Sequence, residues 1–445
     1  MTHDLAQALL DAARKAGADS ADALVIEGTS LSIDVRAGRL EHAERAEGLD
    51  IGLRVLVGRR QACVSSSDAS PATLAQMAER AVAMAREAPE DPFAGLADPS
   101  QLSSRRDAAG LDLHDSSDEP DPAQLQDDAQ RAEAAALAVQ GVSRIDQSSA
   151  SFSRRSVAMA ATNGFAGSYA RTSRHTSCVA ITGEGTGMER DWASEGRIHQ
   201  ADLPDAAEIG TRAGERAVAR LGSRKPPSGG FPVLFDERVA ASLVGHLTSA
   251  INGSSIARGG SWLRESLGKP VLPKGFDLTE DPLRPRISGS RPFDAEGLAT
   301  QRRLWVQDGV LLGWVLDLAT GRKLAMPSTA NASRGPTAPP SPSLSNLALT
   351  QGTASRDDLI RDMGTGLVVT SLIGSTINPT TGDYSRGASG FWVENGQITY
   401  PVNECTIAGN LRDMLLRLTA ANDARAYLSM QVPSLLVEGL TIAGA

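Results

Sequence analysis

The segment Asp236–Ser255, DERVAASLVGHLTSAINGSS, carries a single histidine, His246, on a stretch whose apolar residues recur at helical spacing. An imidazole in such a place can be a metal ligand, a general base or a polar side chain on a helix with another role. Asp236, Ser242 and His246 could be combined on paper into a serine hydrolase triad, but no G-x-S-x-G elbow is present to expose the serine. The open question is whether His246 belongs to a metal site or to the structure of the helix.

The glycine-rich segment 363–410, MGTGLVVTSLIGSTINPTTGDYSRGASGFWVENGQITYPVNECTIAGN, is the second candidate for chemistry. It has neither G-x-x-x-x-G-K-[ST] nor a G-x-G-x-x-G turn between a strand and a helix, so we expect no nucleotide site. Glycines at close spacing among β-branched residues favour bulges and close backbone approach instead. One such approach is an extended peptide that pairs with an exposed sheet edge.

Histidines, cysteines and charge narrow the remaining function classes. His175 lies on an expected strand where it can be half-buried, and the other histidines outside the helix lie in polar surroundings. The three cysteines form no C-x-x-C pair, which argues against a disulfide framework or a thiolate zinc site and favours a reducing compartment. The formal charge of −9, without a Lys/Arg stripe, argues against nucleic-acid binding. No signal peptide or membrane-length apolar run occurs in the sequence, so we expect a soluble cytoplasmic protein that does not bind membranes.

The elements that must position these residues predict an α+β fold. Alternating residues between turn signals, among them Glu27-Gly28, predict an antiparallel meander of four or five strands over 21–68, followed by a helix that begins at Pro71 with Ser70 as its N-cap. A second helix over 122–139 and further strands repeat this order, which predicts one domain built from two similar halves, with helices on one face of the sheet.

The stretch SRKPPSGG places a boundary near residue 225. It predicts an N-terminal α+β domain over 1–225 and a strand-rich, barrel-like C-terminal domain over 226–445 that carries the helix with His246. The long Gly/Pro/Ser-rich segment Pro327–Asn346 is expected to be a functional lid or disordered.

Six long motifs, in the same order along the chain, resemble the TldE branch, also called PmbA, of the TldD/TldE metallopeptidase family. They are GMERDWA, GHLTSAINGSSIARGGSWLRESLGKPVLP, RPFDAEGLATQRR, MGTGLVVT, TGDYSRGASGFWVENG and YPVNECTIAGNLRDM. The resemblance covers essentially the whole chain. It implies a cytoplasmic heterodimeric zinc protease in which a TldD-type and a TldE-type subunit enclose a peptide-degrading chamber. The implied substrates are short or unfolded peptides, including leader peptides of microcin-type precursors and the antitoxin CcdA.

The resemblance also implies that the zinc is held by the TldD-type subunit, through an H-E-x-x-x-H helix and a further cysteine near the C-terminus. Aligned on the shared VGH, these six positions correspond to residues 241–246, so Ala241 replaces the first histidine and Ser242 the glutamate. Val432 stands where the cysteine is expected. Because a hydrolytic zinc site uses three protein ligands and a water, we expect no metal and no catalytic residue in this chain, with zinc in the partner. His246 is then a lining residue of the chamber or a local structural residue.

We therefore predict a non-catalytic TldE/PmbA-type subunit that completes the chamber and helps to hold an extended peptide. Whether the chain counts as an enzyme stays open, since activity is expected only with the TldD-type partner. A regulatory or peptide-binding homodimer without a peptidase partner is the alternative, and independent hydrolysis by other chemistry is a third possibility. For Asp383, a role in a tight turn is an equal alternative to binding. The candidate contacts with substrate or partner are His246, Gly364, Gly366, Asp383, Tyr384 and Arg386.

Overall fold

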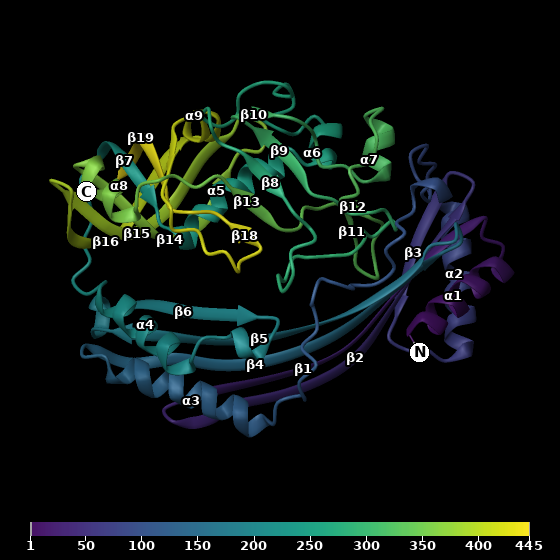
Figure 1. The fold of residues 1–445 in the computed structure, drawn as a ribbon, viewed down its shortest axis with the longest axis horizontal. Coiled ribbons are helices and arrows are strands. Elements are labelled where there is room, and N and C mark those ends of the chain that lie inside the picture. Colours follow the sequence, from purple (N-terminus) through teal and green to yellow (C-terminus); the bar gives the residue numbers. More distant parts are fainter. Residues whose placement is uncertain (1, 445) are drawn as a thin grey trace.

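A long, curved antiparallel sheet forms the first half of the molecule (Figure 1). The computed structural model describes residues 2–444, and this sheet has the strand order β3-β2-β1-β4-β5-β6. Its longest strand has 20 residues, a span of about 65 Å at 3.3 Å per residue. The strands are β1 (Ser20–Arg36), β2 (Arg39–Val57), β3 (Arg60–Ser66), β4 (Val142–Ala161), β5 (Ala166–Thr182) and β6 (Glu189–Arg197).

Two similar halves build this sheet, as the sequence predicts. Each half runs helix, three strands, helix, and the strand order is symmetric about the central pair β1 and β4. The Ser70 side chain caps α2 by accepting a hydrogen bond from the Thr73 amide, which confirms the predicted helix start. Alanine- and leucine-rich faces of the helices bury the outer side of the sheet. The helices are α1 (Thr2–Ala16), α2 (Pro71–Glu87), α3 (Pro122–Ala138) and α4 (Ala206–Val218).

The predicted number of strands over 21–68 is wrong, because the chain forms three strands there, and two of them are 17 and 19 residues long. The predicted turn at Glu27-Gly28 lies in the middle of β1. A Cβ atom at Gly28 would lie 3.0 Å from the Arg154 carbonyl oxygen of β4, so this glycine permits a close approach between strands rather than a turn.

A five-stranded barrel forms the second half, and this confirms the predicted barrel-like, strand-rich region. Strands pair in the order β16-β15-β14-β7-β19, and a pairing between β16 and β19 closes the ring. Only β7 and β14 pair in parallel within it. The barrel strands are β7 (Gly229–Phe235), β14 (Gly366–Ile377), β15 (Asp383–Glu394), β16 (Gln397–Asn410) and β19 (Leu435–Ala443), with β17 (Leu418–Ala420) added beside β19.

Smaller elements surround the barrel. A second sheet has the order β10-β9-β8-β13-β18, and β11 pairs with β12. Its strands are β8 (Leu278–Glu280), β9 (Arg303–Gln307), β10 (Val310–Leu311), β13 (Leu347–Leu349) and β18 (Met430–Gln431), and the separate pair is β11 (Ala332–Ser333) and β12 (Ser341–Pro342). The helices are α5 (Glu237–Ala250), α6 (Gly253–Ala257), α7 (Leu318–Lys323), α8 (Arg356–Met363) and α9 (Leu411–Leu416).

The segment Pro327–Asn346 is ordered and packed, so the prediction of a disordered segment is wrong. It includes β11 and β12, and it reaches the first sheet at Gly52, where a Cβ atom would lie 2.5 Å from Pro336. The side chain of Arg334 is completely buried there and pairs with Asp22 of β1 at 2.6 Å. The segment therefore packs against the first sheet and joins it to the barrel side of the molecule.

The chain passes from α4 to β7 at residues 219–228, where the sequence predicts a boundary near 225. Arg224 stacks over Tyr400 with its guanidinium carbon 3.7 Å from the ring centre, so this connection is itself packed on β16. The division into domains 1–225 and 226–445 stays a prediction. No helix within the described residues is both long and apolar enough to cross a membrane.

Candidate functional site

Helix α5 carries the positions that the sequence singled out. It follows directly on β7, and the Asp236 carboxylate caps it by accepting from the Arg238 amide. One face, which includes Leu243 and Leu247, is buried in the barrel core. The neighbouring face carries Ala241, Ser242, Gly245 and His246, all half-buried.

The side chains at this site do not supply the ligand atoms that a zinc ion needs. Ala241 has no ligand atom, and the Ser242 hydroxyl donates to the Val239 carbonyl of its own helix at 2.7 Å. Val432 is 3% exposed and lies among apolar core side chains. Across residues 2–444, no group of three His, Cys, Asp or Glu side chains is placed to hold a metal. His246 is thus the one imidazole on this face, and a hydrolytic zinc needs three protein ligands.

The His246 imidazole packs against the aromatic ring of Tyr384. The Tyr384 ring meets it edge to face, with centroids 5.8 Å apart and planes at 75°. The His246 Nε2 atom is buried without a hydrogen-bond partner. Burial lowers the pKa of His246, and the nearby positive charge of Arg386 lowers this pKa further. The imidazole is therefore held neutral at pH 7.

Tyr384 and Arg386 share one face of β15, because side chains two residues apart on a strand point the same way. Burial raises the pKa of the Tyr384 hydroxyl to about 12, although the nearby Arg386 guanidinium acts to lower this pKa. Arg386 donates from Nε to the Gly374 carbonyl of β14 at 2.8 Å. The structure therefore brings together three of the predicted residues, His246, Tyr384 and Arg386.

Asp383 points to the other face and belongs to a turn. Its carboxylate accepts from the Thr381 hydroxyl at 2.6 Å and from the Asn410 side-chain amide at 3.0 Å. These hydrogen bonds lower the pKa of Asp383. The turn alternative is the one that the contacts favour.

Gly364 and Gly366 lie at the start of β14, whereas His246 lies near its other end, where Ile377 pairs with Tyr384. Gly364 ends α8 with a φ of 68°, a left-handed conformation that favours glycine. A Cβ atom at Gly366 would lie 2.4 Å from the Pro232 carbonyl oxygen, so close packing of β14 on β7 requires this glycine. Eleven residue steps, about 36 Å of extended strand, separate Gly366 from Ile377. These two glycines therefore shape the barrel and do not reach His246.

A free strand edge lies beside α5. Strand β7 pairs with β14 only at Leu367–Val369, because the chain then turns away into α5. Beyond Val369, β14 pairs only with β15 among the described strands, at residues 371–373 and 376–377. Ile373 is 70% exposed there, and the next three residues are exposed as well. The sequence placed peptide contacts somewhere within 364–390, but it contained no signal for where β7 ends.

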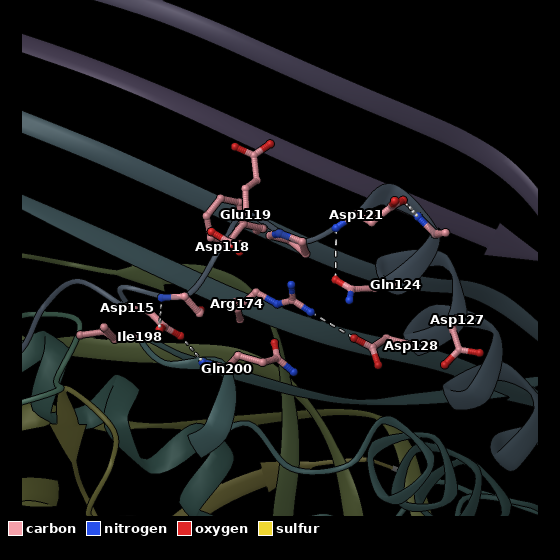
Figure 2. A pocket seen from close by; sticks show the side chains of 14 residues that line it. Asp115, Asp118, Glu119, Asp121, Gln124, Asp127, Asp128, Arg174, Ile198 and Gln200 are labelled. Atoms are coloured by element: carbon pink, nitrogen blue, oxygen red, sulfur yellow. Dashed lines mark hydrogen bonds and ion pairs between the residues drawn. The ribbon is translucent and has the colours of Figure 1, made fainter.

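A cavity of about 800 Å³ lies elsewhere, at the start of α3 (Figure 2). Its lining carries several carboxylates, yet the structure already uses some of them. Asp121 caps α3, and Asp128 pairs with Arg174 at 3.2 Å. Burial would raise the pKa of Asp115, but hydrogen bonds from the Ser117 and Gln200 amides hold this pKa at about 2. The region builds a helix start and a loop and contains no arrangement for catalysis.

Three family models match the chain. They are described as PmbA/TldA metallopeptidase domain 1 at residues 21–85, the central domain at 115–221 and the C-terminal domain at 228–444. A metalloprotease PmbA from Escherichia coli O157:H7 is 37% identical, and the match covers 96% of this chain and 92% of that protein. A metalloprotease PmbA homolog from Haemophilus influenzae is 36% identical and covers 98% of this chain and 94% of that protein.

Solved structures show the same architecture. A crystal structure of a Bacteroides thetaiotaomicron protein has a TM-score of 0.91 at 28% identity, with 99% of this chain and 98% of that chain covered. TldE from Thermococcus kodakarensis has a TM-score of 0.86 with 99% of this chain and 100% of that chain covered. At 18% identity, the second likeness establishes the fold alone.

Proposed function

Because the chain belongs to the PmbA/TldD metallopeptidase family, we propose that it is the TldE/PmbA-type, non-catalytic subunit of a two-chain zinc peptidase. Its partner is a TldD-type subunit that supplies the zinc, and both act in the cytoplasm. The substrates are short or unfolded peptides, of the kind represented by microcin-type leader peptides and the antitoxin CcdA.

The state of helix α5 is the observation that carries this proposal. The helix carries the six positions that the family resemblance aligns with H-E-x-x-x-H, but it presents one imidazole beside an alanine and a serine. Tyr384 covers that imidazole, and burial lowers the pKa of His246. The unpaired Nε2 atom of His246 could bind a metal only together with further ligands, and the residues on this face of α5 offer none.

The role proposed for this chain is to hold the peptide. Apart from the Gly374 carbonyl, which accepts from Arg386, the free edge of β14 over residues 370–377 offers backbone N–H and C=O groups that an extended peptide can pair with. Each such hydrogen bond contributes about 0.5–1.5 kcal/mol irrespective of the peptide side chains. This mode of recognition suits unfolded peptides of varied sequence, because the side chains are left free to differ.

The two-chain proposal is tested by mixing. The purified chain, a TldD-type subunit and their mixture are each incubated with an unfolded peptide, and cleavage is followed by mass spectrometry. We expect cleavage by the mixture, none by this chain alone, and the same rate when this chain carries His246→Ala. Cleavage by this chain alone would overturn the proposal, and a chain that binds the peptide but never joins the partner would favour the homodimeric binding protein instead.

The role of the strand edge is tested by hydrogen exchange. An unfolded peptide should slow amide exchange over 370–377, whereas the same peptide with alternate N-methylated amides should not, because methylation removes the N–H donors. Residues 148–160 of β4, a stretch flanked by β1 on one side and by β5 on the other, serve as an internal control. Equal protection by both peptides would refute pairing through the backbone.

A further inference from the structure

A second, smaller cavity lies at the free edge of β6, away from His246. It has a volume of about 160 Å³ and lies where the first sheet meets the start of α5. Strands β5 and β6, helices α4 and α5 and the segment 425–428 all contribute to its wall. The lining residues are His175, Trp192, Ser194, Glu195, Gly196, Arg212, Arg216, Arg238, Arg425 and Leu428.

Three of the four arginines in this lining already have carboxylate partners. Arg238 pairs with Asp191 at 3.0 Å, and Arg212 pairs with Glu195 at 2.9 Å. The third pair joins Arg425 and Glu237 at 2.8 Å.

Arg216 is different, because no carboxylate lies within 4.0 Å of it in the described part of the chain. Its one hydrogen bond goes from Nη1 to the Trp192 carbonyl oxygen at 3.0 Å. Its side chain is half-buried, and burial together with the like charge of Arg238 lowers the pKa of Arg216.

The surrounding ion pairs do not make up the missing negative charge. The carboxylates that serve the cavity arginines are shared with three more arginines: Arg197 on Glu195 at 3.0 Å, Arg220 on Asp191 at 3.7 Å and Arg356 on Asp236 at 3.0 Å. Arg220 and Arg356 each have one further carboxylate, Glu189 at 3.4 Å and Asp357 at 3.6 Å, and neither of these carboxylates pairs with Arg216. Uncompensated positive charge in a partly buried place is costly unless an anion balances it. His175 adds no charge here at neutral pH, because burial lowers its pKa.

We propose that this cavity binds a small oxyanion. Guanidinium groups donate paired hydrogen bonds that match phosphate and carboxylate oxygens, and Arg216 is the arginine left free to do so. Ser194, whose side chain carries a hydroxyl donor, is among the residues that line the same space. The volume lies below the roughly 300 Å³ at which pockets for organic ligands begin, so the bound group is small. Two sources share this chemistry, free inorganic phosphate and the terminal carboxylate of a peptide.

Trp192 gives a direct optical signal for the test. It is 49% exposed at the cavity, while Trp262, Trp305, Trp314 and Trp392 are each 5% exposed or less. Phosphate is titrated into the full-length chain at constant ionic strength with chloride as the balancing salt, and tryptophan emission is recorded. A short peptide with a free terminal carboxylate and its C-terminal amide are titrated in parallel.

We expect saturable binding that weakens at least tenfold in Arg216→Gln. Arg190→Gln is the matched control, because Arg190 lies on the same strand as Trp192 but its side chain is 75% exposed. Saturation by phosphate identifies the free anion as the ligand, and saturation only by the peptide with a free carboxylate identifies the peptide terminus. No saturation by any of the three, or equal affinity in wild type and Arg216→Gln, would overturn the proposal. Should Arg216→Gln fail to fold, Ser194→Asp places a negative charge in the cavity and must abolish binding. The outcome does not depend on the proposed peptidase role.

Discussion

Replacement of Asp22 by asparagine tests how the two halves of the molecule are held together. Asp22 lies on β1 with its side chain 4% exposed, between two buried guanidinium groups. Arg54 donates from Nε to one carboxylate oxygen at 2.7 Å, and Arg334 approaches the other at 2.6 Å. Arg334 belongs to the segment that packs against the first sheet from the barrel side, so one carboxylate joins the two halves.

The expected loss of stability follows from this burial. Asparagine keeps the shape of the aspartate side chain, so no cavity forms and the change isolates the charge. Two charges 4 Å apart interact by about 4 kcal/mol at an effective dielectric constant of 20. The lost solvation of the carboxylate offsets part of this gain, and breaking buried pairs costs about 3–5 kcal/mol in practice. Because two arginines are left without compensation, we expect Asp22→Asn to lower the free energy of unfolding by about 3–5 kcal/mol.

The assay is urea unfolding at pH 7, with the free energy of unfolding obtained by linear extrapolation. Asp11→Asn is the control, since Asp11 and Arg14 form a pair at 3.0 Å with side chains 52% and 53% exposed, and its loss costs at most about 1 kcal/mol. Adding Arg334→Met to Asp22→Asn removes one buried cation and should recover part of the loss. The reasoning is refuted if Asp22→Asn costs no more than Asp11→Asn, or if the second substitution makes the protein still less stable.

Three further predictions follow from single positions. The pKa of His246 lies below its ordinary value of 6.5, so the stability that the neutral imidazole contributes is complete above about pH 6.5 and is lost as the pH falls toward the pKa of the folded state. NMR titration should place the midpoint below 6.5 and Arg386→Gln should raise this midpoint, whereas a midpoint above 6.5 contradicts the burial argument. Gly210→Ala should destabilise the protein strongly, because the added Cβ would lie 1.9 Å from a backbone oxygen of α3, whereas Gly245→Ala, which has open space around it on α5, should leave stability unchanged or raise it by up to about 1 kcal/mol. Thermal melting of both variants checks this pair, and similar melting temperatures would contradict the close contact at Gly210. Burial raises the pKa of the Cys178 thiol to about 12, so iodoacetamide at pH 8 should modify this residue slowly in the native protein and rapidly in urea, and equal rates would contradict its burial.

Local patterns predicted much of the fold because each depends on neighbouring residues. The capping serine at Ser70 and the paired order of helices and strands are readable within about 20 residues, and both are present in the structure. The turn expected at Glu27-Gly28 failed for a non-local reason. Gly28 faces the backbone of Arg154, which is remote in sequence, and no local pattern distinguishes such a contact from a turn.

The candidate site was predictable only in part for the same reason. Tyr384 and Arg386 alternate on one strand, so their shared face could be expected, but their approach to His246 joins positions about 140 residues apart. The free edge of β14 exists because β7 ends at Phe235, and only the assembled barrel shows which strand is then left without a neighbour. The cavity around Arg216 gathers side chains from several elements and left no motif in the sequence.

Zinc content of the chain by itself tests the central claim most directly. The full-length protein is purified, exposed to excess zinc, dialysed against a weak chelator and analysed by inductively coupled plasma mass spectrometry. A non-catalytic subunit should retain far less than one zinc per chain, and His246→Ala should leave this value unchanged. One zinc per chain that is lost in His246→Ala would contradict the account, because it would mean that this helix still holds a metal.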